Sequence, residues 1–156
     1  MRTLLLFALL VPSVVAIRAA DVEFLRVWPG WRDAESFERI SEYFGGEENT
    51  GRQLVLRTQP DTRAGFYFLV RVKSAAALGA ATFELSVIRP DTPEPKTYRF
   101  AAAVPKKETV FQLGLTGNDW PASEEAHPVA WKLALLGSDG RVLTEEKSFL
   151  WEKPAN

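Results

Sequence analysis

Apolar and polar residues alternate with a period of two along most of the chain after residue 20. The segment 65–73, GFYFLVRVK, is the clearest case, because its even-numbered residues Phe66 to Val72 are all apolar while its odd-numbered ones include Arg71 and Lys73. Such alternation is typical of a strand with one face in the core and one toward solvent. The pattern predicts a strand whose even-numbered side chains point inward.

Seven further segments show the same alternation and are separated by turn residues, notably the proline-containing stretches 89–95 and 104–108. Proline cannot donate a hydrogen bond to a neighbouring strand, so we expect strand pairing to end at these stretches. Seven to eight short strands with regular punctuation predict a mainly β fold, an antiparallel β-sandwich. The further segments are 22–28, 52–58, 81–89, 96–104, 108–116, 129–136 and 141–151.

The last two of these segments flank the turn residues GSDG, which predict a β-hairpin. The returning strand changes phase, because Leu143 and Phe149 share a parity with the polar residues Glu145 and Lys147 between them. Two interpretations remain open. The strand either emerges into solvent or contains a bulge that shifts its register.

One segment departs from the period of two. After WPGW (28–31), where Pro-Gly indicates a turn, Asp33 can cap a helix in which Phe37, Ile40, Tyr43 and Phe44 recur at helical spacing. Gly45 and Gly46 would end it. The pattern predicts one short helix after the first strand, stable only when its apolar face is buried.

The tryptophans of this stretch allow two hypotheses. Trp28 and Trp31 could form a structural corner that seals the helix against the sheet. Alternatively, they could stay exposed with Trp120 and offer flat apolar surface to a sugar ring or to a partner protein. The two hypotheses differ in whether the indole rings are buried.

The first residues resemble a secretory signal peptide. Arg2 precedes an apolar run from Leu4 to Ala16, which is shorter than the roughly 20 residues of a membrane span. We expect residues 1–19 to be a signal removed after Ala16 or Ala19, leaving 20–156 as one domain. An uncleaved anchor is the alternative; the lack of a basic cluster after the run favours cleavage and hence no membrane span.

The amino-acid composition indicates the cellular compartment of the protein and the kinds of partner that it can bind. The chain has no cysteine, and none of its asparagines lies in an Asn-x-Ser/Thr motif, so a disulfide framework and N-glycosylation are excluded. Both absences favour a bacterial periplasm. Removal of Arg2 and Arg18 with the signal leaves 17 basic and 20 acidic groups, a net charge of −3. A near-neutral domain without basic clusters is not expected to bind nucleic acid.

The number and spacing of the predicted strands resemble those of immunoglobulin-like and fibronectin type III sandwiches. The resemblance is one of architecture, since the chain lacks a cysteine pair and Trp131 lies on the penultimate strand, away from the position of the immunoglobulin tryptophan. Sandwiches of this kind serve adhesion, chaperone, sugar-binding and structural roles, so the resemblance implies a fold and not an activity.

The sequence offers few residues that could support catalysis. His127 is the single histidine, and with no cysteine and no Gly-x-Ser-x-Gly or His-x-x-x-His motif the common hydrolase and zinc sites lack their residues. Paired carboxylates and a calcium loop at 45–51 or 89–95 remain formal options, but no spacing matches a known calcium loop. We expect neither an enzyme nor a cofactor.

Arg57 and Arg63 flank Asp61 close to the start of a predicted strand. These charges either pair with one another to fix the loop or contact an acidic partner. The sequence thus predicts a secreted, periplasmic, non-catalytic β-sandwich that presents a protein-interaction surface. Carbohydrate binding through exposed tryptophans is the alternative. The candidate binding residues are Trp28, Trp31, Trp120, Arg57 and Arg63.

Overall fold

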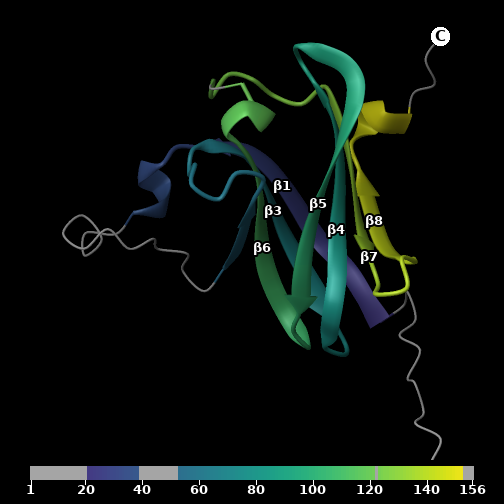
Figure 1. Ribbon diagram of the computed structural model, residues 1–156. Coiled ribbons are helices and arrows are strands. Elements are labelled where there is room, and N and C mark those ends of the chain that lie inside the picture. Colours follow the sequence, from purple (N-terminus) through teal and green to yellow (C-terminus); the bar gives the residue numbers. More distant parts are fainter. Residues whose placement is uncertain (1–20, 39–52, 122, 153–156) are drawn as a thin grey trace, which may run out of the picture.

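The computed structural model describes residues 21–38, 53–121 and 123–152, which form two four-stranded sheets packed face to face (Figure 1). Sheet A has the order β1 (Val22–Arg32), β3 (Gly65–Ser74), β6 (Lys107–Thr116), β2 (Leu54–Arg57). Sheet B has the order β5 (Thr92–Val104), β4 (Leu78–Arg89), β7 (Ala130–Leu136), β8 (Val142–Lys147). Three short 3-10 helices complete the described part, η2 (Glu35–Phe37), η3 (Gly117–Asp119) and η4 (Phe149–Glu152).

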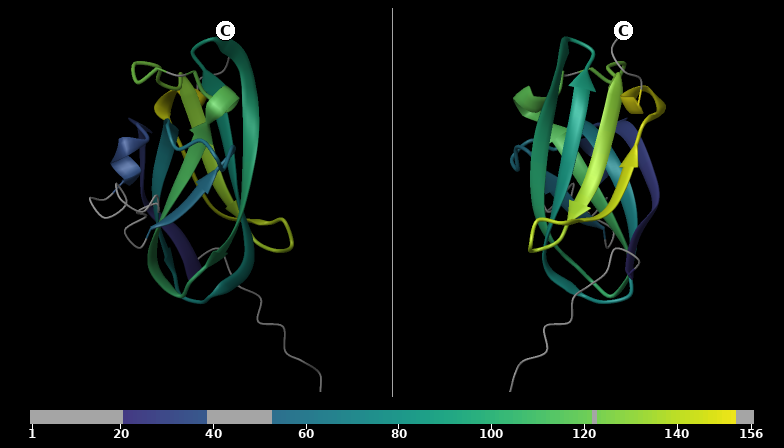
Figure 2. Two further views of the ribbon diagram at one scale, coloured as in Figure 1. Left: turned by 60° about the vertical axis from the view of Figure 1, so that its left-hand side comes forward. Right: turned by 90° about the vertical axis from the view of Figure 1, so that its right-hand side faces the viewer.

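The prediction of a mainly β sandwich is confirmed. Neighbouring strands run antiparallel, except that β2 is parallel to β6. The views in Figure 2 show the two layers, with β1 beside β8 where one side of the sandwich closes. The predicted signal, residues 1–19, lies outside the described residues.

The core fills the space between the sheets as the alternation predicted. The even-numbered residues of β3 from Phe66 to Val72 are all buried, as are Tyr98, Phe100 and Val104 of β5. Val129 has the parity of the buried Leu133 and Leu135 but is exposed, because it precedes the first residue of β7. Alternation therefore predicts which side chains face the core only within the paired part of a strand.

The turn predicted at WPGW is wrong. β1 runs without interruption from Val22 to Arg32, and Pro29 and Gly30 pair with β3 opposite Phe68 and Tyr67. An edge strand tolerates proline, because the missing N–H faces away from the neighbouring strand. Trp31 therefore packs against the core from within a strand and does not form a corner.

The predicted helix is also wrong for the residues that the structure describes. After β1 only the 3-10 turn η2 forms, and Glu38 is already extended, with φ −95° and ψ 143°. The N-cap residue of this turn is Ala34 and not Asp33, although Asp33 Oδ1 does accept a hydrogen bond from Ser36 N at 2.7 Å. The rest of the predicted helix, 39–46, lies outside the described residues.

Irregular strand pairing explains why the alternation of apolar and polar residues changes phase within β8 and within β1. In β8 the register shifts opposite Leu135 and Leu136, between Val142 and Thr144, which selects the bulge over a strand that emerges into solvent. In β1 the extra residue is Leu25, between Phe24 and Arg26. This bulge places Arg26 and Trp28 on the outer face of sheet A, although strict alternation would align them with the inward-facing Phe24.

Candidate functional site

Sheet A carries aromatic rings and arginines on its outer face, here called the arginine–ring face. Three antiparallel strands set its rows through their register: Arg26 lies opposite Arg71, Trp28 opposite Leu69, and Gly30 opposite Tyr67. The adjoining η2 turn and the edge strand β2 complete it. The face comprises Arg26, Trp28, Arg32, Phe37, Arg57, Tyr67 and Arg71.

One end of this face is closed by Phe37, and we call Arg32, Phe37, Arg57 and Tyr67 the Phe37 end. The Phe37 ring is buried and lies 5.0 Å from the Tyr67 ring, centroid to centroid. The guanidinium carbons of Arg32 and Arg57 lie 4.8 and 4.7 Å from the Phe37 centroid. Tyr67 in turn covers Gly114, where any side chain would collide with its ring. The η2 turn thus fastens to the sheet through stacked rings and cations.

Hydrogen bonds fix the groups of the Phe37 end in place. Arg57 Nε donates to the Tyr67 hydroxyl at 2.6 Å, and that hydroxyl donates to the Arg63 carbonyl oxygen at 2.5 Å. Arg32 Nη1 donates to Gln112 Oε1 at 3.0 Å. Every polar group in this chain of bonds has a partner, so this end of the face has the character of a structural anchor.

The Tyr67 hydroxyl thus joins the Arg57 side chain to the Arg63 backbone carbonyl, and neither arginine forms an ion pair with Asp61 among the described residues. Arg63 also forms an ion pair with Glu38, 3.7 Å from Nη1 to Oε1. Arg57 and Arg63 join the β2–β3 loop to the strand below it. The sequence could not show this role, because it does not reveal that the hydroxyl on the outer face of the sheet bonds to both residues.

At the other end of the face, which we call the Trp28 end, Arg26 and Arg71 flank Trp28. Their guanidinium carbons lie 4.6 and 5.7 Å from its ring centroid. Both arginines are exposed and Trp28 is half-buried. Among the described residues, no carboxylate lies within ion-pair distance of either arginine. This end offers cationic, aromatic surface to solvent.

The other two predicted tryptophans lie elsewhere. Trp31 faces the core side of sheet A, opposite Phe66 in the register. Trp120 follows η3 and is only 3% exposed, with its ring 4.8 Å from the Phe66 ring. Its Nε1 finds no hydrogen-bond acceptor among the described residues. Trp28, Trp31 and Trp120 thus do not line one groove.

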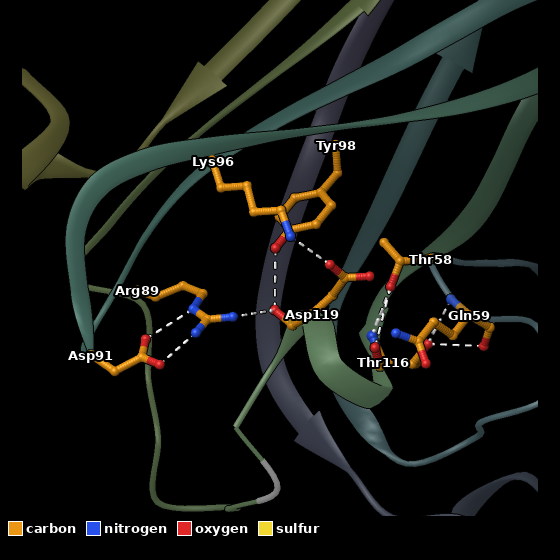
Figure 3. Close-up of polar contacts among 8 residues, drawn as sticks. All are labelled: Thr58, Gln59, Arg89, Asp91, Lys96, Tyr98, Thr116 and Asp119. Atoms are coloured by element: carbon orange, nitrogen blue, oxygen red, sulfur yellow. Dashed lines mark hydrogen bonds and ion pairs between the residues drawn. The ribbon is translucent and has the colours of Figure 1, made fainter.

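A second polar cluster lies at one end of the sandwich, where η3 meets the β4–β5 turn (Figure 3). Lys96 Nζ donates to Asp119 Oδ1 at 2.7 Å, and the Tyr98 hydroxyl and Arg89 Nη1 donate to the Asp119 carbonyl at 3.2 and 3.1 Å. Arg89 also pairs with Asp91 through both Nε and Nη2. These bonds fasten the segment after β6 to sheet B.

The pKa values of this cluster follow from its pairing. Burial opposes ionisation of Asp119, but hydrogen bonds from Lys96, Thr58 and Gln59 outweigh it and hold the Asp119 pKa below its ordinary value. The hydrogen bond to Asp119 raises the pKa of Lys96. Burial raises the pKa of Tyr98. The charged forms satisfy one another, which is the pattern of a structural ion-pair network.

The described residues were compared with the requirements of a metal site and of a membrane-spanning helix. The described ranges contain no group of three or more His, Asp or Glu side chains placed to hold a metal ion. His127 is exposed and meets the edge of the Phe66 ring at 5.8 Å. Nor does any helix within residues 21–38, 53–121 and 123–152 have the length and apolarity that a membrane crossing requires.

Sequence reasoning missed Arg26 and Arg71 as candidate binding residues. Alternation had already placed Arg71 on the outer face of its strand, and Arg26 shares a parity with Trp28. What was lacking was the register that sets Arg26 beside Arg71 across two strands more than forty residues apart.

The chain matches no protein-family model, and a search of curated proteins finds no significant match.

Proposed function

We propose that this protein is a secreted, periplasmic, non-catalytic domain that binds another protein through the Trp28 end of the arginine–ring face. The observation that carries the proposal is the exposed pair Arg26 and Arg71, stacked on Trp28 with no carboxylate in reach among the described residues. Tryptophan and arginine are the side chains most enriched among residues that dominate protein–protein binding. The apolar run at residues 4–16 supports export.

We further propose that the sandwich is immunoglobulin-like. In support, the order β1-β3-β6 corresponds to strands A, B and E, and β5-β4-β7-β8 to strands C′, C, F and G. The short strand β2 occupies the place of strand D beside β6, but it runs parallel and comes earlier in the chain. On this assignment β2 is an addition to the fold.

The test of the function uses the chain from residue 20 as bait in a pull-down from periplasmic extract. The double variant Trp28→Ala/Arg71→Ala is compared with a matched pair on the other sheet, Trp131→Phe/Arg99→Ala. We expect proteins captured by wild type and by the control to be lost from the first variant. Capture that is unchanged by Trp28→Ala/Arg71→Ala would contradict the proposal. N-terminal sequencing of the exported protein tests the start at Ile17 or Ala20.

The free edge of β5 is a second surface on which a partner could bind. No strand pairs with its outer side among the described residues, so a partner strand could add to sheet B there. Pro93 and Pro95 block one half of this edge. Residues 99–104 remain open. Binding that survives the Trp28 variant and is lost on proline substitution at Ala101 or Ala102 would assign the partner to this edge.

Carbohydrate binding, the alternative from the sequence, requires exposed indole faces in one groove. No observation favours it, since Trp120 is buried, Trp31 faces the core side and the Trp28 ring is flanked by arginines.

A further inference from the structure

The Trp28 end holds two like charges in direct opposition. Arg26 and Arg71 are Cα partners in the antiparallel pair of β1 and β3. Like charges directly opposite one another destabilise a sheet. Arginine stays protonated at every relevant pH, so this repulsion cannot be relieved by loss of a proton. The fold therefore keeps an unfavourable pair on an exposed surface where neutral side chains would serve it better.

The neighbouring row of residues that lie opposite one another on β1, β3 and β6 contains charges of both signs, which neutralise one another. Lys73 lies between Glu23 on β1 and Glu108 on β6, and its Nζ is 3.3 Å from Glu23 Oε1. Positive and negative charges alternate across this row. The row of Arg26 and Arg71 continues to Val110 on β6, which supplies no carboxylate. Among the described residues, the row of Arg26 and Arg71 thus lacks the negative charge that the row of Lys73 has.

The surroundings of the two arginines suit an extended chain. Leu69 lies opposite Trp28 and is half-buried, and Gly30 has open space where a side chain would be. Leu69 thus offers apolar surface beside the guanidinium groups that lie against the Trp28 ring. Each guanidinium can receive a carboxylate through two parallel hydrogen bonds, while Leu69 contacts the aliphatic part of the incoming side chains.

We propose that the Trp28 end binds an extended acidic segment of a partner protein, whose carboxylates supply the negative charge missing between Arg26 and Arg71. This inference rests on the proposed function and adds the chemistry of the partner. Charge complementarity selects the occupant: alternate residues of an extended segment share one face, about 7 Å apart. A sequence with Glu or Asp at alternate positions therefore presents a row of carboxylates to the two guanidinium groups.

The test measures fluorescence anisotropy of a labelled Glu-Ala repeat peptide of eight residues against the chain from residue 20. The matched probe is the Gln-Ala repeat, and oligogalacturonate tests an acidic polysaccharide. The protein variants are Arg26→Glu, which places a carboxylate opposite Arg71, and the charge-matched control Arg141→Glu in the exposed β7–β8 turn.

We expect the Glu-Ala peptide to bind wild type and Arg141→Glu alike, and to bind Arg26→Glu at least about tenfold more weakly. The melting temperature of Arg26→Glu should equal or exceed that of wild type, because the new carboxylate pairs with Arg71. Such a result separates lost binding from lost folding.

Equal binding of the Glu-Ala and Gln-Ala peptides, or equal binding to wild type and Arg26→Glu, would overturn the inference. Binding of oligogalacturonate without binding of the peptide would also overturn it, in favour of a polysaccharide. If the peptide fails while the pull-down still depends on Trp28 and Arg71, the surface binds a partner of other chemistry. In that case the proposed function stands and this inference falls.

Discussion

The two ends of the arginine–ring face use the same residue types to different effect. At the Phe37 end, two arginines stack on a fully buried ring and donate hydrogen bonds to fixed acceptors on the protein. At the Trp28 end, two arginines stack on a half-buried ring, and both guanidinium groups are exposed. A stacked arginine with satisfied donors contributes stability, whereas one with donors in solvent is available to a ligand.

The difference comes from what lies above each ring. Phe37 of the η2 turn packs against the Tyr67 ring and both rings are buried, whereas Trp28 is half-buried between two exposed arginines. Burial therefore distinguishes the anchor from the proposed binding surface, whereas the residue types of the two clusters are the same. Substitutions at the two ends should separate these roles.

Phe37→Ala should give the largest effect. Truncation of a buried phenylalanine costs about 3–5 kcal/mol in unfolding free energy, and here it also removes the stacking surface of Arg32 and Arg57. Trp28→Ala should cost about 1 kcal/mol, since its ring is half-buried. Urea unfolding of both variants is the measurement. Equal losses would mean that the two ends do not differ as anchor and surface.

Tyr67→Phe should have the next largest effect. It keeps the ring over Gly114 and removes the hydroxyl that accepts from Arg57 and donates to the Arg63 carbonyl. A buried donor or acceptor left without its partner costs about 1–3 kcal/mol. Urea unfolding gives the loss, and Tyr98→Phe, at the other cluster, is the control for removal of a half-buried hydroxyl. A Tyr67→Phe protein as stable as wild type would show that the hydrogen-bond chain contributes nothing.

Acid sensitivity should come from the Asp119 cluster and not from either end of the face, because arginines do not titrate. The folded-state pKa of Asp119 is lowered, so its ionised form stabilises the protein above the unfolded-state pKa of about 3.9, and this stability is lost as pH falls through the folded-state value. Asp119→Asn should cost about 1 kcal/mol at pH 7. Melting curves from pH 7 to pH 2 should show wild type losing that advantage on acidification; a pH-independent difference would contradict the assignment.

The smallest effect should appear at the Trp28 end as a dependence on salt. Arg26→Gln removes one of two opposed like charges, so at low ionic strength the variant should be more stable than wild type by a few tenths of a kcal/mol. Because the repulsion is between exposed groups, 1 M NaCl should abolish the difference. Lys73→Gln, which removes a cation that is paired with Glu23, should show no such gain.

Strand positions and core faces could be predicted from the sequence, because alternation is a local property. The inward-facing residues of β3 and β5 are buried, as their pattern indicates: Phe66, Phe68, Val70, Val72, Tyr98, Phe100 and Val104. The turn predicted at WPGW was wrong, although Pro-Gly indicates a turn in most contexts. The Pro-Gly pair lies on an edge strand here, and this position lets β1 continue through it.

The candidate site depends on non-local facts. Arg26 and Arg71 become neighbours through a register that joins distant strands, and the bulge at Leu25 sets the face on which Arg26 lies. Tyr67 has the alternation of an outward-facing residue, and it is outward-facing, yet it is buried because Phe37 covers it. No local pattern gives either outcome.

The order of strands in the two sheets bears on the order in which the strands pair during folding. Sheet B contains the local hairpins β4–β5 and β7–β8. Within the described ranges, β1 pairs only with β3 and β2 only with β6. Val22 and its partner Ser74, and Leu54 and its partner Phe111, are each more than fifty residues apart along the chain. Contacts between distant residues form slowly, since the intervening loop must be closed first. We therefore expect the hairpins of sheet B to form early and the edge strands of sheet A to dock last. On this expectation Arg26 meets Arg71 only in the final step, so the Trp28 end should be the last part of the surface to form.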